Sequence, residues 1–258
     1  MNRSSARHVL VALAPRWIVR SLARRHYVRA IPAFFEPDAG IACSLLRSGE
    51  TAVDVGANVG WYTYLLALAV GPAGTVYSIE PVPPVYQLLR HVTRKLQLGN
   101  VTPINTALSH RSGEAIMRVP IGEDGLPNYY RSAIVTAEPG TDVTIDYTVN
   151  TRTLDDILGD KTVTLIKVDV EGHELATIRG GRLLLERCRP ALLIEVSSDP
   201  DDQTSDAWRL RKLLEDLGYE MFYLDGGVLR ARRIGAKSIN YFFLQPKHCS
   251  RISVPLES

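Results

Sequence analysis

From residue 51 onward, short apolar runs alternate with segments of helical period, and this alternation constrains the fold more than any other feature. The apolar runs cover residues 51–55, 75–79, 101–108, 163–170 and 191–196. The helical segments cover residues 61–70, 84–98, 173–188 and 205–217. Alternating strands and helices are typical of an α/β domain with a largely parallel sheet. We therefore predict a Rossmann-like sheet, mostly parallel, with helices on both faces.

Two regions depart from this alternation. Residues 113–150 contain short β segments and polar turns, which predicts a β-rich insertion between the third and fourth core strands. Residues 220–224 and 239–244 are apolar segments joined by a loop rich in Gly and Arg. This pair predicts an antiparallel C-terminal hairpin at one edge of the sheet.

The positive charge of the chain is concentrated at its N-terminus. Residues 1–35 hold seven Arg and no acidic residue, whereas the other 223 residues carry 23 basic and 28 acidic side chains. The acidic body argues against a general nucleic-acid binder. We predict a basic amphipathic helical arm over residues 1–40 and one catalytic domain over residues 41–258. Helical spacing of the arm is indicated by Arg16, Arg20 and Arg24, and by Leu10, Leu13, Ala14, Trp17 and Ile18 despite Pro15.

Cysteine usage and hydropathy bear on the compartment. The three cysteines are far apart and form no C-x-x-C pair, which fits reduced thiols in the cytoplasm. The apolar stretch 8–15 is short for a signal peptide and is not followed by a small-residue cleavage site. We expect a cytoplasmic protein. Its arm either lies on the inner face of an anionic membrane or, as we favour, packs over the mouth of the site or on a partner subunit such as a second copy.

Four of the apolar runs carry a carboxylate at or near their C-terminal end: Asp54, Glu80, Asp169 and Glu195. A buried carboxylate without a partner is costly, so each should be paired or exposed in a crevice. In open α/β sheets, ligands bind in the crevice outside the carboxyl ends of the strands. One such acid could simply cap a helix or mark where a strand reaches water. Four in one sheet favour a site.

The first acid precedes a glycine turn in the sequence VDVGANVGWYT, residues 53–63. Gly56 and Gly60 suit a tight strand-to-helix turn whose free N–H groups favour an anionic ligand group. Glu80 lies 20 residues beyond Gly60, where a carboxylate can accept hydrogen bonds from both ribose hydroxyls. The cofactor is therefore a dinucleotide or S-adenosylmethionine. The acid before the turn, the G-x-x-x-G spacing and the lack of a second mononucleotide-binding half favour S-adenosylmethionine.

The fourth run, LIKVDVEGHE, is the most unusual segment. With a two-residue period, Lys167, Asp169 and Glu171 share one face of the strand. The two carboxylates could coordinate a divalent cation, receive a proton from the substrate or orient a hydroxyl group. The alternative is an internal ion-pair cluster in which Lys167 neutralises the acids. Beside a cofactor crevice we favour the functional interpretation.

Taken together, VDVGANVGWYT, SIEP, KVDVEGHE and LLIEV resemble the FkbM family of S-adenosylmethionine-dependent methyltransferases, in the right order over about residues 50–245. The resemblance implies a class I methyltransferase fold with a seven-stranded sheet and a reversed last hairpin. It implies cofactor-binding roles for Asp54, Gly56, Asn58 and Gly60 at the methionine end with Thr63 nearby, for Glu80 at the ribose, and for Asn105, Ala107 and Ser109 at the adenine.

The same resemblance places Asp169 and Glu171 on the acceptor side, with Lys167 and Glu195 completing the expected catalytic set. The family pattern continues after the fifth strand with Glu-x-His, whereas this chain reads Glu195-Val-Ser197. We therefore expect Asp169, and not a histidine, to act as general base, directly or through a divalent cation held with Glu171.

We expect O-methylation of a hydroxyl group on a sugar or glycan, a glycolipid or a polyketide-type small molecule. Tyr129, Tyr130 and Tyr147 of the insertion either stack on this acceptor or pack the insertion onto the sheet. Two rival functions are a NAD-type oxidoreductase and a non-catalytic nucleoside-binding protein. We expect no nucleic-acid substrate, because the body is acidic and the chain lacks the Asn/Asp-Pro-Pro-aromatic motif of amino-methylating enzymes.

Overall fold

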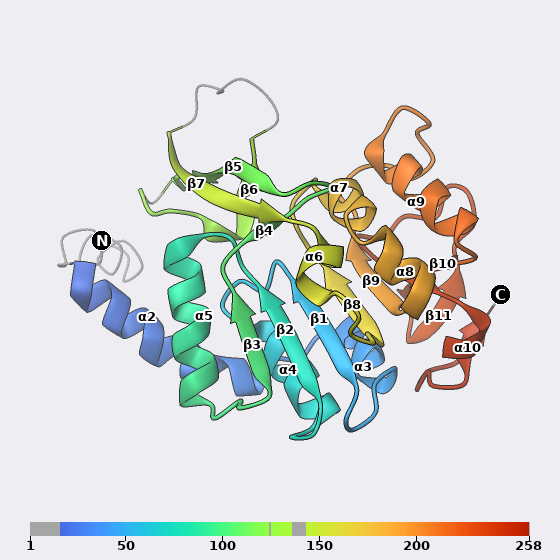
Figure 1. The fold of residues 1–258 in the computed structure, drawn as a ribbon, viewed down its shortest axis with the longest axis horizontal. Coiled ribbons are helices and arrows are strands. Elements are labelled where there is room, and N and C mark those ends of the chain that lie inside the picture. The colour runs from blue at the N-terminus through green and yellow to red at the C-terminus, as the bar shows by residue number, and fades with distance from the viewer. Residues whose placement is uncertain (1–15, 124, 136–142, 258) are drawn as a thin grey trace.

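A nine-stranded sheet forms the centre of the computed structural model, which describes residues 16–123, 125–135 and 143–257 (Figure 1). Its strands are β1 (Thr51–Val55), β2 (Thr75–Ile79), β3 (Val101–Ile104), β8 (Leu165–Val168), β9 (Ala191–Glu195), β10 (Glu220–Asp225), β11 (Val228–Ala231), β12 (Asn240–Leu244) and β13 (Leu256–Glu257). Their order is β13-β11-β10-β12-β9-β8-β1-β2-β3. The five adjacent strands β9, β8, β1, β2 and β3 run parallel to one another. Strand β12 is antiparallel to both of its neighbours, β9 and β10.

The seven predicted strands are therefore present, and two more extend the sheet beyond the predicted hairpin. β10 pairs with β12 as expected, but it also pairs with β11 on its other side. The turn into β11 is Gly226-Gly227, with φ of 56° and 85°. Positive φ at both positions is what a two-residue hairpin turn of type I′ requires. The glycine-rich segment that we interpreted as a loop thus holds a strand, and β13 pairs with β11 outside it.

Helices cover both faces of the sheet, as predicted. One face packs against α6 (Leu154–Leu158), α7 (Glu174–Arg179), α8 (Arg182–Cys188) and α9 (Asp206–Asp216). The other face packs against α3 (Pro37–Ser44) and α4 (Trp61–Val70). Alternate residues of the same strands serve the two faces: Val53 and Ile166 belong to the first core, and Ala52 and Leu165 to the second. This double burial explains the continuous apolar runs.

Two predicted elements are divided by close contacts between distant segments. The helix predicted over 173–188 is broken at Gly180-Gly181 into α7 and α8. Only Gly fits at position 180, because a Cβ there would lie 2.1 Å from the Ser109 carbonyl oxygen. The run 101–108 forms β3 and the separate β4 (Ala107–Leu108), with Asn105 between them. The Asn105 side chain donates to the carbonyls of Glu80 and Pro81, so it bonds to the end of β2.

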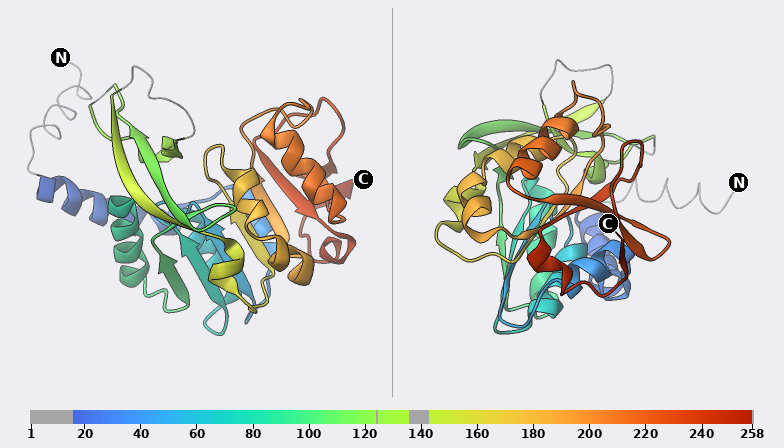
Figure 2. Two further views of the ribbon diagram at one scale, coloured as in Figure 1. Left: turned by 45° about the horizontal axis from the view of Figure 1, so that its top comes forward. Right: turned by 90° about the vertical axis from the view of Figure 1, so that its right-hand side faces the viewer.

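The insertion forms a small second sheet, as predicted. It consists of β5 (Gly113–Pro120), β6 (Ala133–Ile134) and β7 (Thr144–Arg152) together with β4, in the order β4-β7-β5-β6. A short 3-10 helix, η2 (Tyr129–Arg131), lies within it. In Figure 1 the carboxyl ends of β1, β2 and β3 point toward this sheet, and Figure 2 shows it on the opposite side of the molecule from β10 and β11.

The N-terminal segment packs on the domain through its last turns. Helix α2 (Arg16–Ala30) lies beside α5 (Pro83–Lys95) and continues through η1 (Ile31–Ala33) to α3, so the boundary expected at residue 40 falls inside α3. Tyr27 makes an edge contact with Trp61, at 6.0 Å between ring centroids. Residues 1–15, including the predicted Leu10, Leu13 and Ala14, lie outside the described part. Within the described residues, no helix is long and apolar enough to cross a membrane.

Candidate active site

A cavity of about 430 Å³ opens at the carboxyl ends of the parallel strands. The loops after β1, β2 and β8 and the last residue of β9 contribute to its wall, together with β4, η2 and Phe34. This is the position at which open α/β sheets bind ligands. The four acids singled out from the sequence, Asp54, Glu80, Asp169 and Glu195, all line this one cavity.

The loop after β1 turns tightly because three residues adopt positive φ: Gly56 at 74°, Asn58 at 47° and Gly60 at 103°. A Cβ on Gly56 would lie 1.7 Å from the carbonyl oxygen of Asp169, so no other residue fits there. The Gly56 and Ala57 N–H groups both donate to the Ile79 carbonyl. The turn therefore brings β1, β2 and the residue after β8 into contact under the cavity.

Glu80 is held by the backbone on both sides. Its Oε2 accepts from the Asn58 N–H at 2.9 Å and its Oε1 from the Val82 N–H at 2.8 Å. Burial nevertheless raises its pKa to about 7, because only 5% of the residue is exposed. Each carboxylate oxygen has further acceptor capacity. A pair of vicinal hydroxyl groups in the cavity, such as those of a ribose, fits this arrangement.

Asp54 is fully buried and has one oxygen in need of a donor. The Thr63 hydroxyl donates to Asp54 Oδ2 at 2.6 Å and also lies 2.9 Å from the Ser78 hydroxyl. Asp54 Oδ1 has no hydrogen-bond donor among the described residues and lies 4.0 Å from Lys167 Nζ. Burial raises the Asp54 pKa, and Lys167 opposes this effect. An unsatisfied acceptor beside the cavity suits a cationic ligand group such as an ammonium.

Three carboxylates form a second feature of the wall: oxygens of Asp169, Glu171 and Glu195 lie within 4.8 Å of one another. Burial, then the charge of Asp169, raises the pKa of Glu195 to about 7 and also raises that of Glu171. Glu171 has φ of 47°, which is uncommon for a residue other than Gly and here aims the loop after β8.

Lys167 supplies positive charge between the two groups of acids. Its Nζ lies 2.9 Å from Asp169 Oδ2 and 4.9 Å from the centre of the Tyr62 ring. Burial lowers its pKa, but Asp169 and Asp54 outweigh burial and raise it overall. The ion-pair interpretation of Lys167 and the functional interpretation of the acids therefore describe the same cluster.

The structure divides the predicted cofactor residues into two groups. Asp54, Gly56, Asn58, Glu80 and Ala107 line the cavity. The remaining residues are not among its lining residues and bond to neighbouring segments or shape turns: Thr63 bonds to Asp54, Gly60 precedes α4, Asn105 bonds to the end of β2, and the Ser109 hydroxyl lies 3.0 Å from His173 Nε2.

Sequence reasoning did not single out Phe34, Trp61 and His173, which also line the cavity. Trp61 and His173 stand inside quoted motifs, so their positions next to Gly60 and Gly172 could have indicated them. Burial, then the nearby His110, lowers the His173 pKa, so its imidazole is neutral near pH 7. No sequence signal pointed to Phe34, which stacks on Trp61 at 5.1 Å from far along the chain.

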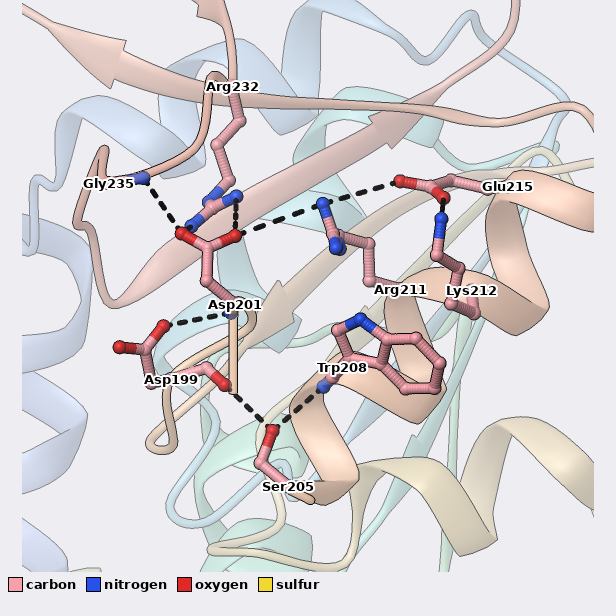
Figure 3. A network of polar contacts seen from close by, with 9 residues as sticks. All are labelled: Asp199, Asp201, Ser205, Trp208, Arg211, Lys212, Glu215, Arg232 and Gly235. Atoms are coloured by element: carbon pink, nitrogen blue, oxygen red, sulfur yellow. Dashed lines mark hydrogen bonds and ion pairs between the residues drawn. The ribbon is translucent and has the colours of Figure 1, made fainter. Parts of the chain in front are cut away.

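A polar network fixes the loop that follows Glu195 (Figure 3). Asp201 accepts from both terminal nitrogens of Arg232, at 2.9 and 2.6 Å, and from the Gly235 N–H at 2.8 Å. The bonds from Arg232, and to a smaller extent the one from Gly235, lower the Asp201 pKa to about 2. Ser205 caps α9 by accepting from the Trp208 N–H at 3.0 Å. The loop that follows β9 is thus tied to the segment between β11 and β12.

A family profile and several known proteins match parts of this chain. The profile of the family described as "Methyltransferase FkbM domain" matches residues 54–221, more than half of the chain. Methyltransferase 1 of Beauveria bassiana is 26% identical over 187 residues, which are 65% of this chain and 71% of that protein. Protein-L-isoaspartate O-methyltransferase of Methanothrix thermoacetophila is 34% identical over 64 residues, 24% of this chain and 30% of that protein.

Among solved structures, methyltransferase FkbM from Methylobacillus flagellatus KT aligns with a TM-score of 0.50 and 19% identity, over 94% of this chain and 59% of that chain. At this identity the likeness bears on the fold alone, and it confirms the predicted class I methyltransferase fold. The chain spans less than two thirds of both the isoaspartate enzyme and the solved FkbM chain.

Proposed function

Because the chain belongs to the FkbM methyltransferase family, we propose that it transfers a methyl group from S-adenosylmethionine to a hydroxyl oxygen of a sugar or glycan, a glycolipid or a polyketide-type molecule. The observation that carries the proposal is that one cavity holds two sets of groups. Glu80 and Asp54 offer acceptors for a nucleoside and an ammonium, and Asp169, Glu171 and Glu195 form a carboxylate cluster beside them. A methyl donor and a hydroxylated acceptor need these two sets.

On the cofactor side, the chain supplies acceptors and a close backbone. Glu80 would accept from the ribose hydroxyls, Asp54 Oδ1 would accept from the amino group, and Gly56 and Asn58 would let the turn approach the ligand. Ala107, which also lines the cavity, would lie on the adenine side. Thr63 and Asn105 act as positioning residues, since they hold Asp54 and the end of β2. S-adenosylmethionine, when bound, supplies a methyl group on a sulfonium whose positive charge is lost on transfer.

On the acceptor side, Asp169 would take the proton of the acceptor hydroxyl while the hydroxyl oxygen bonds to the methyl carbon and the bond from that carbon to sulfur breaks, its electron pair remaining on sulfur. Lys167 Nζ, 2.9 Å from Asp169 Oδ2, forms an ion pair with this carboxylate. Glu171 orients the acceptor. Glu195, with its pKa raised to about 7, holds a proton near Asp169 and so avoids two adjacent negative charges. The fixed geometry of these groups aligns acceptor and donor, which is the main contribution of a protein to such a displacement.

A divalent cation bound by Asp169, Glu171 and Glu195 is the second form of this proposal. Carboxylate oxygens at such separations are ligands that Mg²⁺ accepts, and the cation would lower the proton affinity of the hydroxyl group. Lys167 already provides positive charge at Asp169, so we favour the direct route. Turnover that survives exhaustive chelation supports the direct route, whereas activity lost on chelation and restored by Mg²⁺ supports the cation.

Mass spectrometry tests the reaction itself. Glycan, glycolipid and polyketide extracts are incubated with the protein and S-adenosylmethionine, and products that gain one methylene are identified. Asp169→Asn is the matched variant: we expect turnover to fall at least about 100-fold while cofactor affinity stays nearly unchanged. Titration calorimetry with S-adenosylmethionine and with NAD separates the proposal from an oxidoreductase. Binding of NAD alone, or wild-type turnover by Asp169→Asn, would contradict it.

The aromatic side chains at the cavity mouth are candidates for acceptor selection. Tyr129 and Tyr130 of η2 line the cavity, and the Trp61 indole N–H lies 3.5 Å from the Tyr130 hydroxyl. Tyr147 is not among the lining residues and packs in the core of the insertion. Aromatic faces suit the apolar face of a sugar or macrocycle. We expect Tyr130→Ala to raise the KM for the acceptor and to leave cofactor affinity unchanged; equal acceptor KM values would remove Tyr130 from this role.

A further inference from the structure

Helices α2 and α5 form a basic surface beside the cavity. They pack against each other, and Figure 1 shows them side by side at one end of the molecule. Neither helix contains an acidic residue. Six exposed cationic side chains, which we call the basic face, come from these two helices: Arg24, Arg25, Arg29, Arg90, Arg94 and Lys95.

The charges of the two helices act on a common region. His91 of α5 has its pKa lowered by burial and then by Arg24 of α2, followed by Arg94 and Lys95 of its own helix. Arg24 therefore lies close enough to α5 for its charge to be felt there. Together with the packing of α2 on α5, this places Arg24 beside the cationic side chains of α5.

These charges have no acidic partner in the part of the chain that the structure describes. In the described ranges, none of the six side chains forms an ion pair, whereas Arg118, Arg182 and Arg209 on other surfaces each pair with a carboxylate. Like charges four residues apart destabilise a helix, and both Arg25–Arg29 and Arg90–Arg94 have this spacing. A helix pair that retains such repulsion in an otherwise acidic body fits an anionic partner.

Exposed apolar side chains accompany the charges. Leu22 of α2 is 56% exposed and shares a shallow hollow with Arg25, His26 and Arg29. Phe35, two residues after η1, is 80% exposed. Apolar groups among arginines match the boundary between headgroups and acyl chains of a bilayer, where cations meet phosphates and apolar groups enter the interface. A nucleic-acid backbone would use the arginines and leave Leu22 and Phe35 without a role.

We propose that the basic face docks on an anionic lipid bilayer. The segment that carries it leads directly to the cavity, because α2 continues through η1 to Phe34, which lines the cavity, and Tyr27 packs on Trp61. Docking therefore holds the mouth of the cavity near the interface, where a lipid-linked acceptor would be presented. The docking itself does not depend on the proposed methyl transfer.

Co-sedimentation of the full chain with vesicles tests the docking without measuring activity. Vesicles of phosphatidylcholine alone are compared with vesicles that also contain phosphatidylglycerol, at about 0.1 M salt, where screening is moderate. We expect binding only to the anionic vesicles, weakening as salt rises. A basic residue near such a surface contributes roughly fivefold in binding, so the triple variant Arg24→Gln, Arg25→Gln, Arg29→Gln should bind about 100-fold more weakly.

The matched control is a triple variant that removes the same charge elsewhere: Arg111→Gln, Arg179→Gln and Arg233→Gln, three exposed arginines outside the two helices. It should bind anionic vesicles like the unsubstituted protein within a few-fold. Circular dichroism and S-adenosylmethionine binding check that both variants fold. Equal losses in the two variants would overturn the proposal, as would binding of a duplex or single-stranded oligonucleotide through the basic face without binding to anionic vesicles.

Discussion

Replacing Glu80 with Gln should separate cofactor binding from folding. The substitution keeps the side-chain shape and removes a charge that is 5% exposed. Burial raises the Glu80 pKa from 4.5 to about 7, which corresponds to a free-energy cost of about 3 kcal/mol for the charged form at pH 8. The variant escapes this cost, but a Gln amide can accept from only one of the two backbone donors, Asn58 and Val82, and the lost bond costs about 1–3 kcal/mol. The free energy of unfolding at pH 8 should therefore change by less than about 2 kcal/mol in the absence of cofactor.

The unfolding free energies of the unsubstituted protein and of Glu80→Gln should depend differently on pH. Because the folded pKa of Glu80 is raised, its contribution to the unfolding free energy is greatest below the unfolded pKa of 4.5 and is lost as pH rises through about 7. Between pH 5 and pH 8 the unsubstituted protein loses about 2 kcal/mol through this one group, and Glu80→Gln does not. The difference in unfolding free energy, variant minus unsubstituted protein, should rise by that amount. In thermal melts without cofactor this is a relative gain of about 4–8 °C for the variant.

Glu80→Gln should bind the cofactor more weakly than the unsubstituted protein, although its relative stability rises with pH. A carboxylate that accepts from two ribose hydroxyls makes charge-assisted hydrogen bonds worth about 1.5–3 kcal/mol each, so calorimetry at pH 8 should show at least about 100-fold weaker S-adenosylmethionine binding. Glu186→Gln is the control, because Glu186 forms an exposed pair with Arg182 that is worth about 0.5 kcal/mol or less. Unchanged affinity in Glu80→Gln would refute the ribose assignment. A stability difference that does not vary with pH would refute the raised pKa.

Two further substitutions test the centre of the site. Gly56→Ala should destabilise the protein by about 2–5 kcal/mol, because its Cβ would meet the Asp169 carbonyl. Gly49→Ala is the control: Gly49 has a similar φ of 89° but open space around it, so this substitution should cost about 1 kcal/mol. Equal melting temperatures of the two variants would refute the close approach at Gly56. Lys167→Met should lower the unfolding free energy by about 3–5 kcal/mol at pH 8, since it leaves Asp54 buried without a counter-charge. That loss should shrink at pH 5, where Asp54 takes up a proton more easily; a loss independent of pH would show that Lys167 acts through packing alone.

Local signals predicted the half of the fold around the cofactor turn. β1, β2 and α4 have the bounds read from the sequence, because each apolar run ends at a Gly or at an acid that stops it. The elements that were misjudged depend on contacts between distant segments. The helix break falls at Gly180, where the Ser109 backbone from a distant segment packs closely, and β11 pairs with the outer edge of β10. A strand stabilised mainly by its neighbour has a weak signal of its own.

The site also contains features that the sequence could predict and features that it could not. The carboxylates at strand ends could be predicted to converge, because parallel strands end at one edge of the sheet and burying an unpaired charge is costly. The direction in which a side chain points beyond the end of a strand could not be predicted from the sequence. Thr63 points back to Asp54 and Asn105 to the end of β2, although the family resemblance implies that both lie beside the cofactor. Phe34 reaches the cavity only because the N-terminal helices pack on α4.

The two outer strands of the large sheet have a consequence for self-association. At one edge, the Ile104 carbonyl accepts from the Glu80 N–H, so the preceding residue, Pro103, turns its backbone outward and has no N–H to offer there. At the other edge, β13 pairs over only two residues. Neither edge presents a long row of open donors and acceptors, which is how natural sheets avoid polymerising edge to edge. If two copies of this chain pair, we expect them to meet through helices or loops and not by continuing one sheet into the next.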